Sequence, residues 1–483
     1  MLDGTICVFL AEALMLPTGV ITAGFLTRRF GATDYGVWTL AVVIVFWVEW
    51  SITSIFERPT IKVVSTADDW QPIGATVLRL YLIVSSSAML LLWLLAAPIA
   101  ALLHEPGLTT YLRLFSLDLP IFSLACAHRH ILIGLGKFRQ RACAGASRWT
   151  ARLVLIVLLV SAGWSVTGAI LGCIGASLVE CIVCRCYVRP SLVARSTLLA
   201  HHLWDYAVPL FLYALTMRFY DKLDLLALKA MGGTTEQAGI YGAAHNLSLL
   251  PGLFGVAFSP LLLSTLNHML HAGYQREARA LGQQGLRCVL LLLPFAGMTA
   301  GMASEVVRLV FGAPFLPAAS LLALLIFGSL ALVMLSVATS ILIAAGKSGW
   351  TLAVAGPLIP LALVGHLLLI PRWGASGAAC VNTCVAGLGA WAAVAAVHRV
   401  WRILPPIATW IRSVCICGVV YAVAVLWHTP GLWLLVKLSV MGLLIPLLYT
   451  VLDEFSTSEI ILLRSRMRWC TVPPRILRHE EDR

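Results

Sequence analysis

The chain has 483 residues, of which 60% are hydrophobic and 12% charged, and its formal charge of +12 comes from 34 Lys and Arg against 22 Asp and Glu. Ordinary soluble proteins have roughly a quarter charged residues, so this composition excludes that class. A membrane-spanning helix needs about 20 apolar residues, and the apolar content is sufficient for about fourteen of them. The excess of Lys and Arg first indicates cytoplasmic loops rather than nucleic-acid binding.

In chain order, the apolar segments predict an all-α polytopic membrane protein with fourteen transmembrane helices. The segments lie near residues 5–26, 36–56, 75–103, 108–134, 141–163, 166–187, 205–230, 238–267, 286–303, 317–345, 348–370, 375–397, 407–427 and 431–451. The first is too long for a cleaved signal peptide. The longest connectors, 57–74, 188–204 and 268–285, are too short to fold as domains.

The distribution of positive charge tests this count of helices. When residues at segment ends are counted with the connectors (Arg141, Arg185 and Lys229), connectors after even-numbered segments and the C-terminal tail hold nineteen Lys and Arg, whereas connectors after odd-numbered segments hold five. The positive-inside rule then predicts that both termini lie in the cytoplasm. The basic tail, 453–483, is interpreted as a topology determinant or a contact with anionic lipids.

Three sequence matches indicate an internal repeat. Residues 131–137 (ILIGLGK) recur as 341–347 (ILIAAGK) at an offset of 210, and Gly168-Ala169 recurs as Gly377-Ala378 at an offset of 209. Residues 30–38 resemble 233–242 at an offset of 202 to 203. The repeat predicts two pseudo-symmetric six-helix lobes, 1–200 and 201–400, followed by an extra helix pair at 401–452. Parallel repeats of this kind are typical of transporters that rock one half against the other.

A resemblance to a known family rests on the segment 25–44, FLTRRFGATDYGVWTLAVVI. Arg29, Gly31, Asp34, Gly36 and Trp38 occupy the places of the opening signature of the O-antigen flippase (Wzx-type) family. Residues 220–255 and 132–138 resemble further parts of the family, which belongs to the multidrug/oligosaccharidyl-lipid/polysaccharide (MOP) exporter superfamily. The resemblance implies two six-helix lobes, two further helices, and movement of undecaprenyl-diphosphate-linked oligosaccharide between leaflets by alternating access. Membrane lipids and the polysaccharide polymerase machinery are the other expected partners.

Charged residues inside apolar segments are candidate site residues, because an ionisable group at bilayer depth is costly unless it serves a purpose. Arg141, Arg148 and Arg152 in the fifth segment are spaced by seven and four and share one face of a helix. Such a row suits a diphosphate, since arginine grips phosphate oxygens in bidentate fashion. Alternatively, Arg141 reaches the surface and the other two pair with acids such as Glu12, Glu49 or Asp118.

The fourth and seventh segments add further candidates. Arg129 and Asp118 lie eleven residues apart in the fourth segment and share a face. The seventh segment carries Arg218, Asp221, Lys222 and Asp224. We expect Arg129, Arg218 and Lys222 to face the anionic substrate with the arginine row. Asp118, Asp221 and Asp224 are predicted to bind the coupling H+ or Na+, although the seventh-segment charges could also neutralise one another.

Other functions leave weaker signals in the sequence. A MATE-type cation exporter would favour an anionic cavity, and a membrane-embedded polymerase or glycosyltransferase would favour a large outer loop. A lipid II flippase stays open, because no residue separates one lipid-linked sugar from another. Cys181, Cys184 and Cys186 lack a second ligand pair nearby and are interpreted as packing thiols. The prediction is therefore a transporter without catalytic residues, metal or cofactor.

Overall fold

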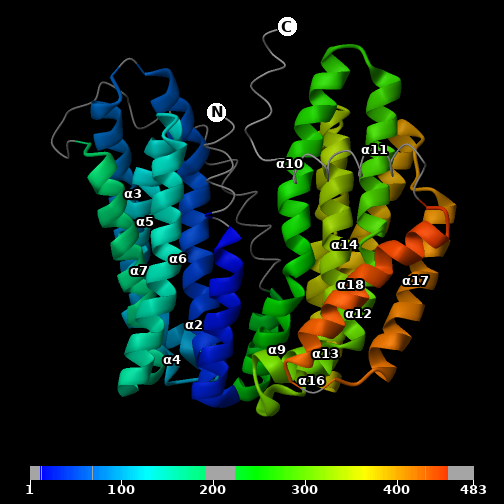
Figure 1. The fold of residues 1–483 in the computed structure, drawn as a ribbon. Helices are drawn as coiled ribbons and strands as arrows, with labels where there is room; N and C mark the ends of the chain where they lie inside the picture. The colour runs from blue at the N-terminus through cyan, green and yellow to red at the C-terminus, as the bar shows by residue number, and fades with distance from the viewer. Residues whose placement is uncertain (1–10, 12, 68, 191–222, 430, 455–483) are drawn as a thin grey trace, which may run out of the picture. The chain divides into compact units, whose positions relative to one another are not determined.

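The computed structural model describes residues 11, 13–67, 69–190, 223–429 and 431–454, and the regular structure in these ranges is helical (Figure 1). This confirms the expected all-α class. The α-helices are α2 Met15–Thr66, α3 Gln71–Leu102, α4 Leu108–Ser116, α5 Asp118–Gly134, α6 Phe138–Leu159, α7 Ser165–Tyr187, α9 Thr235–Ser248, α10 Leu250–His271, α11 Gln275–Leu290, α12 Leu293–Gly301, α13 Ala303–Val310, α14 Ala318–Ala344, α15 Ser348–Ala355, α16 Leu358–Trp401, α17 Ile407–Leu426 and α18 Trp433–Val451. A π-helical turn, Val160–Trp164, and a 3-10 turn, Ala313–Phe315, complete the set.

Ten helical stretches of the described chain are long and apolar enough to cross a membrane. Three of them, Met15–Ser65, Phe138–Tyr187 and Gly349–Trp401, have 51, 50 and 53 residues. At 1.5 Å per residue each is about 75 to 80 Å long, more than twice the roughly 30 Å hydrocarbon core. Each also contains one glycine with positive φ, at Gly31, Gly163 and Gly374, where the helical conformation is interrupted. The protein is thus a multi-pass membrane protein whose longest stretches turn at glycines.

Two of the long connectors expected from the sequence are largely helical. The 57–74 connector is wrong as a loop, because α2 continues to Thr66 and α3 begins at Gln71. The 268–285 connector is wrong for the same reason, since only residues 272–274 separate α10 from α11. Hydropathy detects the part of a helix that lies in lipid, whereas charged helical ends extend into water. The third connector, 188–204, falls mostly outside the described residues.

The chain divides into two compact units. One comprises Met1–Leu250, Val306–Ser329 and Leu352–Gly389, and the other comprises Pro251–Glu305, Leu330–Thr351 and Ala390–Arg483. The first unit draws on segments from before and after residue 200, whereas the second lies wholly after residue 250. The lobe boundaries expected from the sequence stay a prediction.

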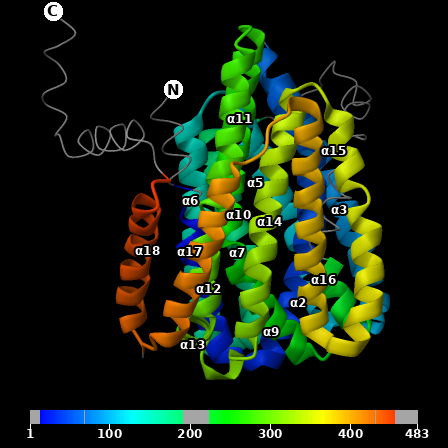
Figure 2. The same cartoon turned by 90° about the vertical axis from the view of Figure 1, so that its right-hand side faces the viewer.

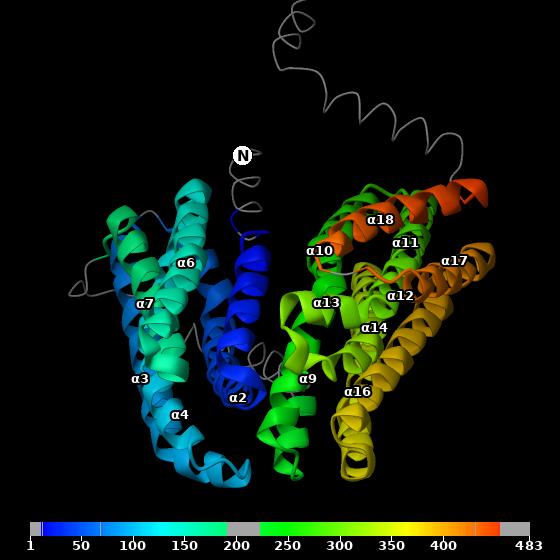
Figure 3. The same cartoon turned by 60° about the horizontal axis from the view of Figure 1, so that its bottom comes forward.

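Small residues allow close helix packing in the first unit, where α6 and α7 lie side by side (Figures 1 and 3). A Cβ added at Gly172 of α7 would lie 2.7 Å from Ile156 Cγ1 of α6, so the helices approach closely at this point. Close approach at glycine is a common way to associate helices in lipid, where hydrophobic burial between helices is weak. Beside them, Phe56, Tyr81 and Phe122 pack α2, α3 and α5 together with side chains at most 5% exposed.

The repeat at 131–137 and 341–347 forms the same turn twice. Gly136 and Gly346 both have φ of 71°. The amide of Lys137 donates to Leu132 O at 2.9 Å, and the amide of Lys347 donates to Leu342 O at 3.0 Å. A left-handed glycine with this backward hydrogen bond is a common helix C-terminal motif. The sequence match therefore corresponds to matching local structure.

The C-terminal helices of the second unit are held by ion pairs. α17 packs along α12, as Figure 2 shows. On α18, Lys437 is fully buried and donates to Glu305 Oε2 at 2.7 Å and to Ala424 O at 2.8 Å.

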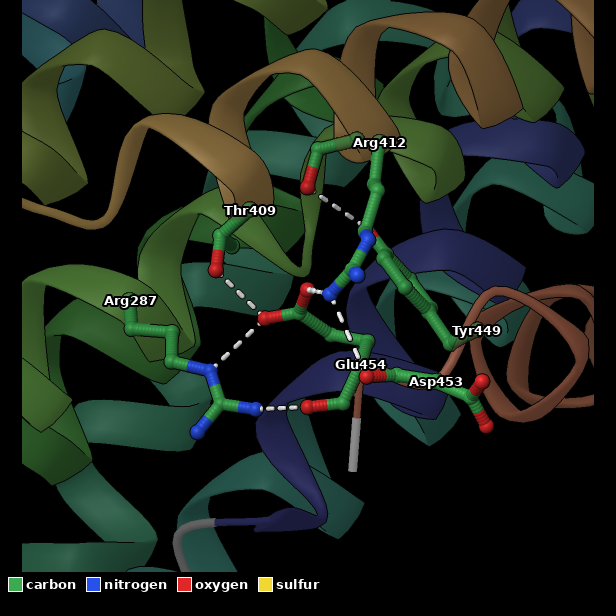
Figure 4. Close-up of polar contacts among 7 residues, drawn as sticks. Arg287, Thr409, Arg412, Tyr449, Asp453 and Glu454 are labelled. Carbon is green, nitrogen blue, oxygen red and sulfur yellow. Dashed lines mark hydrogen bonds and ion pairs between the residues drawn. The ribbon is translucent and has the colours of Figure 1, made fainter. Parts of the chain in front are cut away.

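Directly after α18, Glu454 forms the centre of a second ion-pair cluster (Figure 4). Its carboxylate accepts hydrogen bonds from Arg287 and Arg412, each at 2.8 Å, and from Thr409. Burial would raise the pKa of Glu454, but the hydrogen bonds from Thr409, Arg412 and Arg287 outweigh it and hold that pKa below its ordinary value. The chain is thus fixed to α11 and α17 where α18 ends.

Candidate functional site

A group of charged side chains occupies the interior of the first unit. Glu180 of α7 is fully buried and shared by two arginines. Arg129 Nη1 of α5 lies 3.0 Å from Glu180 Oε1, and Arg148 Nε of α6 lies 3.4 Å from Oε2. The side chains of Arg129 and Arg148 are 17% and 11% exposed. Three helices are therefore joined by one carboxylate.

The arginine row predicted on one face of α6 has aromatic neighbours as well. The Arg148 guanidinium carbon lies 4.3 Å from the centre of the Phe122 ring. That of Arg152 lies 5.3 Å from the Phe46 ring of α2. Arg141 lies near the start of the same helix and is partly exposed. The row faces α2, α5 and α7, and Arg148 is already paired with an acid, although not with one that the sequence analysis named for it.

Asp118 lies at the first residue of α5 and is 1% exposed. Glu49 of α2, also 1% exposed, lies within interaction range of it, and so does Arg148. Neither Asp118 oxygen makes a well-formed hydrogen bond. Asp118, Arg148 and Arg129 thus belong to one interior polar core with Glu49 and Glu180.

Asp224 forms a separate buried centre with residues far along the chain. Its Oδ2 accepts a hydrogen bond from Tyr241 at 2.5 Å and from Asn382 at 2.9 Å, and its Oδ1 accepts one from the Leu225 amide at 2.7 Å. The side chain is 3% exposed, and His366 is near enough to interact with it. The carboxylate is thus well supplied with donors.

Three of the predicted site residues, Arg218, Asp221 and Lys222, lie outside the described residues. Among the residues that the structure does describe, no cluster of three or more His, Cys, Asp or Glu side chains could hold a metal ion.

The family motif lies where α2 turns and meets α9. Gly31 has φ of 70° and interrupts the helix, while Arg29 and Asp34 are exposed on either side of it. Arg28 and Arg29 border an open groove of about 510 Å³ with Val20, Ile21, Gly24, Phe25 and Val310.

Gly36 lies at a crossing of the two segments that the repeat relates. A Cβ at Gly36 would meet the Thr235 carbonyl group, and a Cβ at Gly239 would meet that of Ala32. A Cβ at Gly242 would lie 2.5 Å from Thr39 Cγ2. The residues that make these contacts occupy equivalent positions in the two copies of the repeat. At an offset of 203, the equivalent positions are Ala32 and Thr235, Gly36 and Gly239, and Thr39 and Gly242. The weakest of the three sequence matches thus marks a symmetrical small-residue crossing.

A polar cluster lies at the same end of these helices. Glu105, from the turn between α3 and α4, accepts hydrogen bonds from Lys229 at 3.4 Å and from Thr235. Lys229 also donates to Thr235 at 2.8 Å and is 3% exposed. Thr234 caps the start of α9 in a reciprocal arrangement with Gln237. These contacts connect the turn before α4 to the turn before α9.

The sequence analysis missed several functional contacts. Glu180 and the pair Glu105 and Lys229 were not assigned roles, since no spacing rule connects residues on different helices, and Glu49 was named only as a possible acid partner of the arginine row. One signal was available, because segments rich in buried arginine require acids elsewhere in the apolar sequence.

Comparison with solved structures identifies the fold. The lipid II flippase MurJ, in an inward closed conformation, matches with 14% identity and a TM-score of 0.74, over 97% of this chain and 100% of MurJ. The MATE transporter VcmN of Vibrio cholerae matches with 16% identity and a TM-score of 0.56, over 83% of this chain and 96% of VcmN. An inward-facing multidrug resistance MATE transporter of the MOP superfamily matches with 12% identity and a TM-score of 0.59, over 86% and 95% of the two chains. The fold is therefore that of MOP-superfamily flippases and transporters.

The sequence comparison gives the family. The family model for polysaccharide biosynthesis proteins matches residues 25–320, which is more than half of the chain. The chain belongs to this polysaccharide biosynthesis protein family, which confirms the resemblance seen in the sequence. No curated protein matches the sequence.

Proposed function

We propose that this chain is a flippase that moves undecaprenyl-diphosphate-linked oligosaccharide across the inner membrane, for export of O-antigen, exopolysaccharide or capsule. Membership in the polysaccharide biosynthesis family supports the glycan substrate. The likeness to MurJ and the MATE transporters supports a fold that rocks between two states. The symmetrical crossing of α2 and α9 is the single structural observation that carries the mechanism.

The proposed topology has fourteen spans, lobes at 1–200 and 201–400, and both termini in the cytoplasm. Counting each of the three glycine-interrupted stretches twice converts ten stretches into thirteen spans, and the expected seventh, 205–230, lies largely outside the described residues. Contacts between connectors support the alternation. Glu105 pairs with Lys229, and Glu305 accepts a hydrogen bond from the Thr429 amide. Each of these residues lies in a connector that follows an odd-numbered span, or at the end of such a span, so both contacts join connectors expected on the same side of the membrane. Gln283 meets Leu404 O between two even-numbered connectors.

Alternating access requires one end of the transport path to close while the other opens. In the proposed topology the α2 and α9 crossing lies at the outer end, where repeat-related segments meet through Gly36 and Gly239. The ion pair between Glu105 and Lys229 lies beside this crossing. We propose that these contacts close the outer end and separate when the glycan is released.

The arginine row is the proposed binding site for the lipid diphosphate. Arg152 contacts the Phe46 ring, and its Nε makes no hydrogen bond, so it can receive a phosphate oxygen with little rearrangement. Arg129 and Arg148 keep Glu180 as their shared acid and add positive charge beside the phosphate. Arg141, Arg218 and Lys222 complete the proposed set. Asp118, Asp221 and Asp224 are the proposed coupling carboxylates, and H+ or Na+ is the coupling ion.

The test is export of surface glycan in cells whose own copy of this chain is deleted. Arg152→Glu should abolish export and cause the lipid-linked precursor to accumulate. Arg152→Lys should retain part of the export activity, because lysine keeps the positive charge at this position. Arg139→Glu is the matched control, since Arg139 is exposed on the same helix. Normal export by Arg152→Glu, at normal membrane abundance, would remove the row from the substrate path.

Two other substrates are distinguishable in the same cells. A lipid II flippase would be required for growth in the absence of other lipid II flippases, and a MATE-type exporter would change resistance to cationic compounds. Loss of surface glycan with unchanged growth and resistance supports the proposed function over both alternatives.

A further inference from the structure

Glu49 and Asp118 form a buried carboxyl pair within the interior polar core. They come from α2 and the start of α5, and each is 1% exposed. They lie within interaction range of each other. Neither the two oxygens of Asp118 nor Oε1 of Glu49 make a hydrogen bond of good geometry, although Ser177 and Glu49 lie close enough to Asp118 to share one with it. Buried polar atoms in proteins are almost always bonded, so this exception requires an explanation.

A single proton supplies the missing bond. Two ionised carboxylates are acceptors only, so they cannot bond to each other. They also repel each other strongly when both are buried. With one proton between them, one group becomes a donor and the other an acceptor, as in the carboxyl pairs of aspartic proteases. We propose that Glu49 and Asp118 bind one proton between them and are the proton site of this transporter.

The surroundings favour a proton over a metal cation. Arg148 and Arg152 approach the pair from α6, and Cys173, Ser177 and Glu180 approach from α7. Two guanidinium groups repel an added Na+, which also needs several oxygen ligands at once. A proton needs one acceptor and adds no bulk.

The proton changes the charge of the whole interior core. The core contains three arginines and three acids, so its net formal charge is zero when all of them are ionised. The arginines are Arg129, Arg148 and Arg152, and the acids are Glu49, Asp118 and Glu180. When the pair binds a proton, the core gains one net positive charge and an anion is attracted more strongly. Because coupling between two binding sites is reciprocal, an anion bound at the arginines must raise the proton affinity of the pair by the same factor by which the proton raises the anion affinity. This step rests on the proposed function, whereas the shared proton itself does not.

Infrared difference spectroscopy of the purified full-length protein tests the shared proton. A protonated carboxylic acid has a carbonyl band that is separate from the carboxylate bands and shifts in D2O. The wild type should show this band at neutral pH, and the band should disappear at high pH. Absence of any such band in the wild type at neutral pH would overturn the proposal without any variant.

Isosteric variants separate a shared proton from a proton on one acid. Glu49→Gln and Asp118→Asn should each abolish the same band, because the remaining carboxylate lies beside Arg148 and Arg152 and ionises. A band that survives in either variant means that one acid alone holds the proton, which contradicts the pair. The matched controls are Glu57→Gln on α2 and Asp69→Asn before α3, both exposed, and they should keep the band.

A binding measurement tests the linkage to anions. At the pH where half of the infrared band is lost, inorganic pyrophosphate is titrated into the protein in two buffers that differ in heat of protonation, so that calorimetry reports proton uptake. Wild type should take up protons on binding, and Glu49→Gln should take up none. Unchanged uptake in the variant would refute the linkage. If the infrared band is present but surface glycan export does not depend on the chain, the proposed function fails while the proton site stands.

Discussion

Substituting Gly36 with alanine should force apart the crossing of α2 and α9. The added Cβ would lie 2.9 Å from the Thr235 carbonyl carbon, closer to its oxygen, and 3.1 Å from the Gly239 nitrogen. Ordinary contacts of a Cβ begin at about 3.4 Å, so the two backbones must separate by more than half an ångström. Both neighbours are backbone atoms, which cannot rotate away.

The magnitude follows from the cost of overpacking a close contact, about 1–3 kcal/mol. That cost applies only when the crossing is closed, so the ratio of closed to open molecules should fall about 5-fold to 150-fold. The helix itself gains from alanine in place of glycine, so a change in this ratio is not explained by helix propensity. Gly239→Ala should act in the same direction, because it meets the Ala32 carbonyl in the symmetry-related position.

The assay is a spin-label distance measurement between Thr33→Cys and Glu236→Cys in a variant without native cysteines. Both positions are exposed and are related by the same offset of 203. Gly36→Ala should increase the population at longer distance. Gly19→Ala is the control, since no atom lies within 4 Å of its added Cβ. A distance distribution for Gly36→Ala that superimposes on that of Gly19→Ala would refute the reasoning.

Three further predictions concern buried charge. Glu180→Gln should lower the free energy of unfolding by about 3–5 kcal/mol, because it leaves Arg129 and Arg148 without their shared acid. Thermal unfolding in detergent measures this loss, and adding Arg129→Gln should restore part of it. Glu305→Gln should cost more than Lys437→Met, since the lysine is fully buried while Glu305 is 17% exposed and keeps its bond from the Thr429 amide; the reverse order of melting temperatures would contradict this. The lowered pKa of Glu454 means that its contribution is complete above the ordinary glutamate value of about 4.3 and is lost as pH falls through the folded value, so Glu454→Gln should flatten the acid side of the stability profile.

The sequence located the apolar helices better than it located their ends. Apolar runs identify the part of each helix in lipid, and thirteen of the expected segments have counterparts in the described stretches when interrupted ones are counted twice. The predicted end of α2 and the predicted start of α11 were wrong, because a helix continues into water wherever its charged residues are solvated. Helical hydrogen bonding does not stop where hydropathy falls.

Candidate site residues could be placed on faces but not paired. Periodicity correctly put Arg148 and Arg152 on the same face of α6, since that depends only on 100° per residue. Their neighbours Glu180 and Phe46 come from α7 and α2, so only tertiary packing brings them together. The Gly36 and Gly239 crossing is intermediate, because the repeat was visible in the sequence while the contact between its two copies was not.

The equality of charge in the interior core constrains how an anionic substrate can bind. A diphosphate that enters a neutral core must displace an acid from its arginine, and Glu180 cannot leave because it is fully buried and shared by two of them. Glu49 and Asp118 are the acids that can give up negative charge without moving, since one proton shared between them lowers the charge of the pair from −2 to −1 in place. Proton binding at this pair is therefore the least disruptive way to make Arg148 and Arg152 available to phosphate.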